Sequence, residues 1–138
     1  MRWWKQPVAG DLTWCFYPQD QRLEPGPKPR PGLVLKVLRV LGDDEQRFVV
    51  QVAYGTSQKV DALLPGEFLL ASDGSEAFRL SGLSFSTKFN LANVEELPYN
   101  DQWFAVPPQP RHGHNPKLGT LHPSLMMRLR AARAAARS

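Results

Sequence analysis

An arginine held between two prolines is the residue of this chain best suited to binding a phosphate group. Arg30 lies in the segment KPRPG, residues 28–32, with Lys28 two positions before it. A guanidinium keeps its charge and offers a fixed fork of N–H donors, which suits the oxygens of a pentacoordinate phosphate. The prolines restrict the backbone on both sides of Arg30, so its side chain loses less freedom when it binds an anion.

Two hydroxyl side chains follow an apolar run elsewhere in the chain. Thr56 and Ser57 lie in AYGTSQK, residues 53–59, directly after a segment with the composition of a strand. Their hydroxyls and the neighbouring backbone N–H groups could bind a second phosphate oxygen. The residues alone favour a simpler interpretation, in which the prolines end a strand and the Gly-Thr-Ser sequence turns the chain.

Other kinds of catalytic site have little support in the sequence. His112 and His114 form a His-x-His pair, but their glycine and proline setting disfavours a regular strand, and no nearby carboxylate or thiol completes a ligand set. Cys15 lies in an apolar segment, where a cysteine is usually inert. We therefore expect exposed loop histidines, including His122, with no metal site, no cofactor and no catalytic thiol.

The composition indicates a single water-soluble domain. The chain has 138 residues, of which 42% are hydrophobic and 22% are charged. No apolar run approaches the roughly 18 residues that span a bilayer, and the first residues lack the apolar stretch of a secretory signal. One cysteine allows no internal disulfide, as in most proteins of a reducing compartment. We therefore expect a cytoplasmic protein with no membrane partner.

The net positive charge comes from one end of the chain. The formal charge is +4, and four arginines lie in the last eleven positions: Arg128, Arg130, Arg133 and Arg137. Because these four equal the whole excess, the rest of the chain is close to neutral. Net charge alone is therefore a weak argument for nucleic-acid binding.

Short β-favouring runs divided by turns predict a mainly β protein, either a small barrel or a sandwich. A loop with five prolines covers residues 18–32, and GDDEQ, residues 42–46, predicts a hairpin turn. The expected strands and shorter strand-like segments cover residues 10–17, 33–41, 47–55, 59–64, 67–71, 77–82 and 84–97.

The last part of the chain predicts a surface segment followed by a helix. We expect residues 98–120, with a proline-rich stretch at 107–116, to form a surface excursion. A helix then covers about residues 124–136, with Ser124 as its N-cap. So short a helix needs its apolar side to dock on the body. That side contains Leu125, Met126, Leu129, Ala132 and Ala136.

The order of four segments resembles the PemK/MazF family of toxin-antitoxin growth inhibitors. GDLTW near the start is followed by KPRPGLVLKV, then FVVQVAYGTSQK, then NLANVEELPY. The resemblance covers about residues 9–105 of a single domain, residues 1–138. It implies a small SH3-like barrel of the CcdB/PemK type with a C-terminal α-helix, and a homodimer.

The resemblance also implies an activity and the residues that perform it. Active members are metal-independent endoribonucleases that cut single-stranded RNA to 2',3'-cyclic phosphate and 5'-hydroxyl ends, and a small antitoxin neutralises them. The catalytic arginine and threonine of the family match Arg30 and Thr56, with Ser57 as the alternative. Lys28 and Lys59 would add phosphate contacts.

Three aromatic side chains have two possible roles. Trp14, Phe16 and Tyr54 would either stack on unpaired RNA bases or pack in the core.

One departure from the family leaves the activity open. Glu95 and Glu96 stand where members often carry a basic residue and a hydroxyl, and two carboxylates would repel phosphate unless they face away from the RNA. The alternative function is a non-catalytic or domesticated barrel that binds nucleic acid or a protein target such as DNA gyrase.

Overall fold

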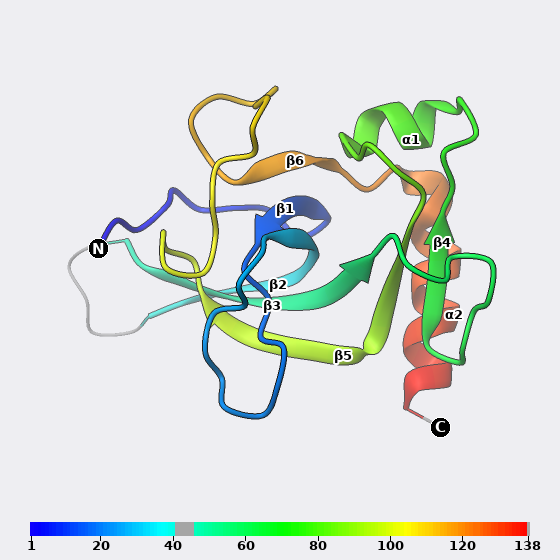
Figure 1. Ribbon diagram of the computed structural model, residues 1–138, viewed down its shortest axis with the longest axis horizontal. Helices are drawn as coiled ribbons and strands as arrows, with labels where there is room; N and C mark the ends of the chain where they lie inside the picture. Colours follow the sequence, from blue (N-terminus) through cyan, green and yellow to red (C-terminus); the bar gives the residue numbers. More distant parts are fainter. Residues whose placement is uncertain (41–45, 138) are drawn as a thin grey trace.

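One curled antiparallel sheet forms the body of the protein (Figure 1). In the computed structural model, which describes residues 1–40 and 46–137, the strands lie in the order β4-β5-β3-β2-β1-β6. The strands are β1 Asp11–Cys15, β2 Arg30–Arg39, β3 Phe48–Thr56, β4 Glu67–Leu70, β5 Thr87–Pro98 and β6 Lys117–Thr120. The mainly β architecture predicted from the sequence is confirmed.

The central strands alternate their side chains between two apolar clusters, one on each face of the sheet. Leu33 and Val34, consecutive in β2, belong to different clusters, as the two-residue period of a strand requires. The first cluster contains Trp4, Cys15, Tyr17, Val34, Phe48, Val50, Val52, Leu97, Tyr99, Trp103 and Phe104. The second contains Leu12, Leu33, Ala53, Phe68, Leu70, Leu83, Phe89, Leu91, Leu121, Leu125 and Ala132.

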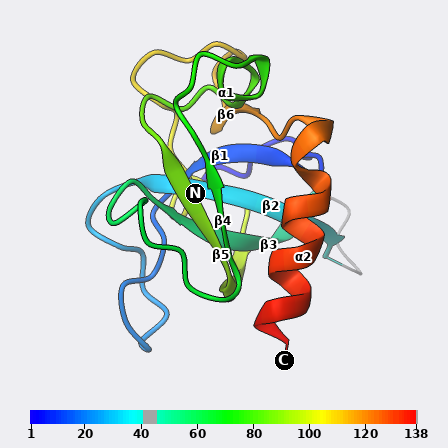
Figure 2. The ribbon, with the colours of Figure 1, turned by 90° about the vertical axis from the view of Figure 1, so that its right-hand side faces the viewer.

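The terminal helix covers the second cluster. Helix α2, Met126–Ala136, runs beside β4 and contacts β4 and β5 (Figure 2). Leu125 and Ala132 are buried, and Met126 and Leu129 pack against the same cluster, so the predicted apolar side is confirmed. Among the described residues, no helix is long and apolar enough to cross a membrane.

The start of the terminal helix differs from the sequence prediction. A 3-10 turn, Pro123–Leu125, precedes α2, and the N-cap of this turn is His122. The backbone N–H of Ser124 donates to Nδ1 of His122 at 3.1 Å. The prediction of Ser124 as the N-cap is therefore wrong, because an imidazole nitrogen accepts the hydrogen bond that a hydroxyl was expected to accept.

Two segments expected to be strands have other structures. Residues 77–81 belong to helix α1, Glu76–Ser81, whose N-cap Ser75 accepts a hydrogen bond from Phe78 N, and Gly82 is its C-cap with φ 70°. These two caps fix a helix where apolar composition indicated a strand. Residues 59–61 form a turn, and residues 62–64 are irregular.

The expected surface excursion at 98–120 is partly buried. Tyr99, Trp103 and Phe104 belong to the first cluster, and β6 pairs with β1. The exposed parts are residues 101–102 and residues 108–114 of the proline-rich stretch, whose end residues Pro107 and Pro116 are buried. The excursion therefore closes one face of the sheet and adds its last strand.

The pairing of β2 and β3 confirms the two strands of the predicted hairpin. The predicted turn between them, residues 42–46, lies largely outside the described residues. β2 and β3 pair antiparallel from Gly32 opposite Tyr54 to Arg39 opposite Phe48. β1 lies between β2 and β6, so its edges are both paired. The edges of β1 and the apolar side of α2 are therefore occupied within the chain, and the homodimer stays a prediction.

Candidate functional site

A cavity of about 430 Å³ opens where β2 begins and β3 ends. Its walls also include Trp14 of β1, Leu118 of β6, the segment 82–87 after α1, and part of the proline-rich stretch. Two arginines, Arg30 and Arg111, line it. Among the described residues that line it, none is Asp, Glu, His or Cys. The cavity is therefore cationic, with no carboxylate on its walls to repel an anion.

Arg30 begins β2 and has one nitrogen without a partner. It lies opposite Cys15 of β1, and extending the β2–β3 register by two residues from Gly32 and Tyr54 sets Arg30 opposite Thr56. Its Nε atom is buried and makes no hydrogen bond within residues 1–40 and 46–137. A buried N–H of a charged group without a partner is unfavourable. Arg30 also lines the cavity, so an anion bound there would lie beside this residue.

Thr56 presents its hydroxyl at the end of β3. The side-chain oxygen accepts a hydrogen bond from Gln58 N at 3.1 Å. A hydroxyl is both a donor and an acceptor, so this bond leaves the proton of Thr56 able to donate to a ligand oxygen. Ser57 is exposed and also lines the cavity. Both residues therefore line the same cavity as Arg30.

Glycine at position 55 lets β2 and β3 approach closely enough to form this site. A Cβ added at Gly55 would lie 2.6 Å from the carbonyl oxygen of Pro31 and 2.7 Å from the Phe89 ring. Any larger residue would push the start of β2 away from the end of β3. In the sequence Tyr-Gly-Thr, the glycine therefore allows the close packing of the two strands, and the threonine supplies the hydroxyl.

A buried ion pair lies on the other side of Thr56. Lys88 of β5 is opposite Thr56, and its Nζ lies 3.1 Å from Oε1 of Glu67, with the two side chains 8% and 6% exposed. The same Nζ donates to Ala62 O at 3.1 Å, and Glu67 accepts from Leu64 N at 2.7 Å. The charge of Lys88 is thus used inside the fold, where it holds the segment between β3 and β4.

The structure brings four of the predicted site residues together. Trp14, Arg30, Thr56 and Ser57 line the cavity, so the two motifs chosen from the sequence share one site. Their roles in binding or catalysis stay predictions.

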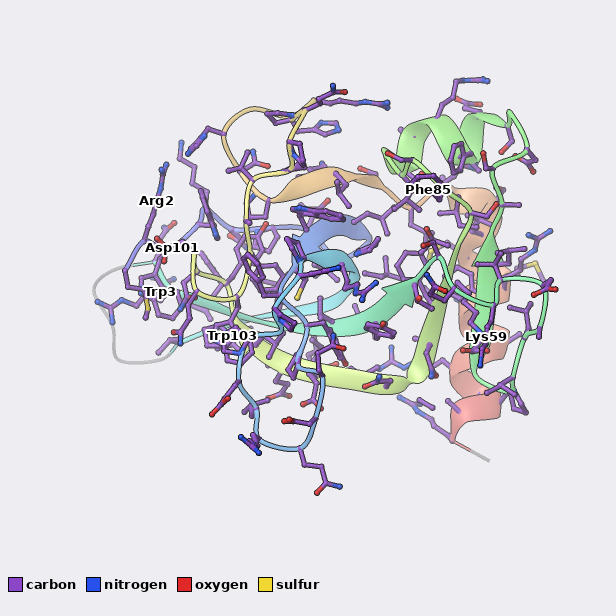
Figure 3. All side chains as sticks on the ribbon, viewed as in Figure 1. Arg2, Trp3, Lys59, Phe85, Asp101 and Trp103 are labelled. Carbon is purple, nitrogen blue, oxygen red and sulfur yellow. The ribbon has the colours of Figure 1, made fainter. Side chains whose placement is uncertain are left out.

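Four other predicted residues lie elsewhere. The described residues that line the cavity do not include Lys28, Phe16, Tyr54 or Lys59. Lys59 lies beside β4, well separated from Phe85 at the cavity (Figure 3). The Tyr54 ring packs 5.1 Å from the Tyr17 ring, which supports the core-packing alternative for that tyrosine.

The two glutamates that depart from the family pattern lie away from the cavity. Glu95 and Glu96 are opposite Val52 and Gln51, and Glu96 accepts from Nε2 of Gln51 at 3.2 Å. On β3, their partners Val52 and Gln51 lie four and five residues before Thr56, which at strand spacing is on the order of 13 Å or more. The carboxylates therefore do not stand in the path of a ligand at Arg30.

The histidines and the cysteine have structural roles or are exposed. His112 is exposed, the His114 ring lies 6.0 Å from the Trp4 ring, and His122 caps the turn before α2. Burial raises the pKa of the Cys15 thiol far above its ordinary value, so it is a poor nucleophile. In the part of the chain that the structure describes, no three His, Cys, Asp or Glu side chains cluster as metal ligands.

Two residues that line the cavity are not among the site residues predicted from the sequence. Phe85 is 70% exposed on the segment after α1, and Arg111 belongs to the proline-rich stretch. Figure 1 shows both segments on the same side of the sheet, above β1. Neither residue stands in a motif, and only the tertiary fold brings them to the cavity.

Two solved structures share the architecture of this chain. One is an endoribonuclease in complex with its cognate antitoxin from a mycobacterial species; it is 17% identical, with a TM-score of 0.56 over 96% of this chain and 95% of that chain. The other, an endoribonuclease from a mycobacterial species, is 18% identical, with a TM-score of 0.52 over 95% of this chain and 90% of that chain. This chain has the fold of these endoribonucleases. The expected small barrel with a C-terminal helix is thus confirmed.

Comparisons at the level of sequence add no relative. No family model matches the chain, and no curated protein matches it. Because both structural neighbours are below 20% identical, the likeness lies in the backbone architecture and leaves the site to be argued from its own residues.

Proposed function

We propose that this protein is a PemK/MazF-type toxin, an endoribonuclease that cuts single-stranded RNA. The carrying observation is the cationic cavity, which is lined by both Arg30, whose Nε has no partner among the described residues, and Thr56, which carries a hydroxyl. The fold shared with two endoribonucleases supports this assignment.

RNA can supply its own nucleophile for this reaction. The 2'-oxygen forms a bond to the adjacent phosphorus while the bond from phosphorus to the 5'-oxygen breaks, which gives 2',3'-cyclic phosphate and 5'-hydroxyl ends. The described cavity lining holds no carboxylate, imidazole or thiol, so the 2'-hydroxyl proton passes to solvent. The leaving 5'-oxygen takes up a proton, for which the Arg30 guanidinium and water are the available donors.

Arg30 and Thr56 would act by stabilising charge. The guanidinium neutralises the negative charge that builds up on the pentacoordinate phosphate, and the Thr56 hydroxyl donates to a non-bridging oxygen. Removing one such donor typically lowers a rate by about 100- to 1,000-fold.

The proposal includes an antitoxin and a second copy of the chain. One structural neighbour is bound to its cognate antitoxin. A small antitoxin with a disordered tail that enters the cavity would block RNA from Arg30, so a tail peptide and RNA should compete. A homodimer is expected from the family resemblance, and the mass of the protein in solution would test it.

The test is cleavage of a mixed-sequence RNA by purified protein in EDTA. We expect cleavage with cyclic phosphate and 5'-hydroxyl ends, and no cleavage of the same sequence made as DNA, because DNA lacks the 2'-hydroxyl. An absence of RNA cleavage, or equal cleavage of the RNA and of the DNA of the same sequence, would overturn the proposal. Growth arrest on expression that persists in Arg30→Ala would instead support the alternative of a non-catalytic binding protein.

A further inference from the structure

The segment after α1 holds an exposed aromatic ring on a well-fixed backbone. Phe85 is 70% exposed, while Leu83 and Thr87 on either side are buried. Thr87 Oγ1 donates to Phe85 O at 2.9 Å, and Ser86 Oγ accepts from Ser72 N at 2.8 Å. The ring is therefore presented to solvent by a segment whose neighbours are anchored, which lowers the entropy lost when the ring binds a ligand.

The proline-rich stretch brings a second guanidinium to the same cavity. Arg111 is exposed, and its Nη1 donates to Arg79 O of α1 at 3.4 Å. A guanidinium carries five N–H donors, so this single long bond leaves most of them for a ligand. Asn115 stabilises the stretch, since its side chain donates to His112 O at 2.6 Å and accepts from Lys117 N at 2.9 Å.

The two residues match the two parts of a nucleotide. An aromatic face stacks on a base of any sequence, and a guanidinium binds a phosphate, which is how single-stranded nucleic acids are held without regard to sequence. The cavity volume of about 430 Å³ lies within the roughly 300–1,000 Å³ of small-ligand sites. The described lining residues contribute two arginines and no acid.

We propose that Phe85 and Arg111 form a second nucleotide subsite, which holds the base and phosphate of a nucleotide next to the bond cut at Arg30. The subsite rests on the proposed ribonuclease function, and it makes the proline-rich stretch a part of the RNA-binding surface. Its ligand is one nucleotide of a single strand.

Binding of a strand that cannot be cleaved tests the subsite separately from catalysis. The probe is a fluorescent 2'-O-methyl RNA of mixed sequence, whose affinity is measured as a function of salt. Phe85→Ala should weaken binding about 5- to 150-fold, and Phe85→Trp should restore it. Arg111→Ala should reduce the slope of log affinity against log salt by about 0.7, which corresponds to one phosphate contact, and Arg111→Lys should keep that slope.

Two surface substitutions serve as matched controls. Met127, 80% exposed, and Arg130, also exposed, lie on α2, and neither lines the cavity, so Met127→Ala and Arg130→Ala should bind as the wild type does. Because Phe85 and Arg111 are exposed, unfolding in urea should show all four alanine variants to be as stable as the wild type.

A base-removal scan locates the nucleotide. In the wild type, an abasic position should weaken binding most where the base stacks on Phe85, and the same abasic position should cost Phe85→Ala little further affinity. If the losses of affinity from the abasic position and from Phe85→Ala add fully at every position, Phe85 does not stack on a base.

The outcomes separate the subsite from the proposed function. RNA cleavage with unchanged probe binding in Phe85→Ala and Arg111→Ala would overturn the subsite and leave the ribonuclease. Probe binding that depends on both residues, without cleavage of natural RNA, would support the subsite and overturn the ribonuclease. If the wild type does not bind the probe, the subsite is overturned, even if the antitoxin tail binds in the cavity.

Discussion

Two cations flank Thr56 on its neighbouring strands, and the protein uses them differently. Lys88 on β5 is buried with Glu67 at 3.1 Å and also donates to Ala62 O. Arg30 on β2 has a buried Nε with no hydrogen bond to any residue that the structure describes. A cation whose hydrogen bonds are made within the chain stabilises the fold, whereas Arg30 lines the cavity and keeps one donor without a partner among the described residues.

The comparison shows why residue type alone does not identify a phosphate-binding side chain. Lys88 and Arg30 are both basic residues in strands beside the same threonine. Lys88 has a partner because of the strand pairing. Glu67 on β4 lies opposite Asn90 of β5, two residues along the strand from Lys88. If the distinction is correct, mutations at Lys88 act on stability and mutations at Arg30 act on catalysis.

The largest effect should come from removing the partner of Lys88. Glu67→Ala leaves a buried ammonium without its carboxylate, and breaking a buried ion pair in this way costs about 3–5 kcal/mol of unfolding free energy. Urea unfolding measures it, with Glu24→Ala in an exposed loop as the control, expected within about 0.5 kcal/mol of wild type. Equal stability of the two variants would show that the ion pair does not hold this part of the fold.

The next largest effect should appear in the cleavage rate of Thr56→Val. Valine keeps the shape of threonine but has no hydroxyl to donate to a phosphate oxygen, so the rate should fall about 100-fold or more. Thr56→Ser should retain most of the activity. Ser57→Ala, tested in the same single-turnover assay, decides between the two hydroxyls, and a larger loss at Ser57 than at Thr56 would reverse their predicted roles.

A smaller change should follow when both members of the buried ion pair are replaced. With methionine at both Glu67 and Lys88 no buried charge is left unpaired, and such replacements are often neutral or stabilising. We expect unfolding free energy within about 1–2 kcal/mol of wild type and a cleavage rate within a few-fold. A large loss of cleavage in a stable double variant would mean that Lys88 acts on RNA.

The smallest effect should come from the two glutamates at the other end of β5. Glu95→Gln and Glu96→Gln remove charges whose β3 partners, Val52 and Gln51, lie on the order of 13 Å or more along the strand from Thr56, beyond the Debye length of about 8 Å at physiological salt. RNA affinity and cleavage rate should each change less than about two-fold. A marked gain of affinity in either variant would place RNA along that end of the sheet.

The sequence predicts those parts of the fold that depend on local pattern. The alternation of β2 and β3 and the apolar side of α2 are visible in the residues. Helix α1 is too short for its periodicity to show, and its two caps, Ser75 and Gly82, are the only local signals. The burial of Trp103 depends on contacts with distant strands, which no local pattern contains.

The residues of the candidate site also divide into those that a local sequence pattern indicates and those that only the tertiary fold brings to the cavity. Arg30 and Thr56 are predicted from their residue types, from the prolines and strand beside them, and from the match to a family pattern, and the structure places both at one cavity. Phe85 and Arg111 reach the cavity through segments that fold back from α1 and from the proline-rich stretch. The partnership of Lys88 with Glu67 follows from the β4–β5 register and was equally hidden.

The most direct test compares Arg30→Ala with the wild type in two measurements on the same preparation. We expect single-turnover RNA cleavage to fall about 100- to 1,000-fold, while unfolding free energy stays within about 1 kcal/mol of wild type. Arg130→Ala, which removes an exposed arginine of α2, should change neither. A cleavage rate within a few-fold of wild type, or a loss of stability as large as that of Glu67→Ala, would contradict the assignment of Arg30 to the phosphate.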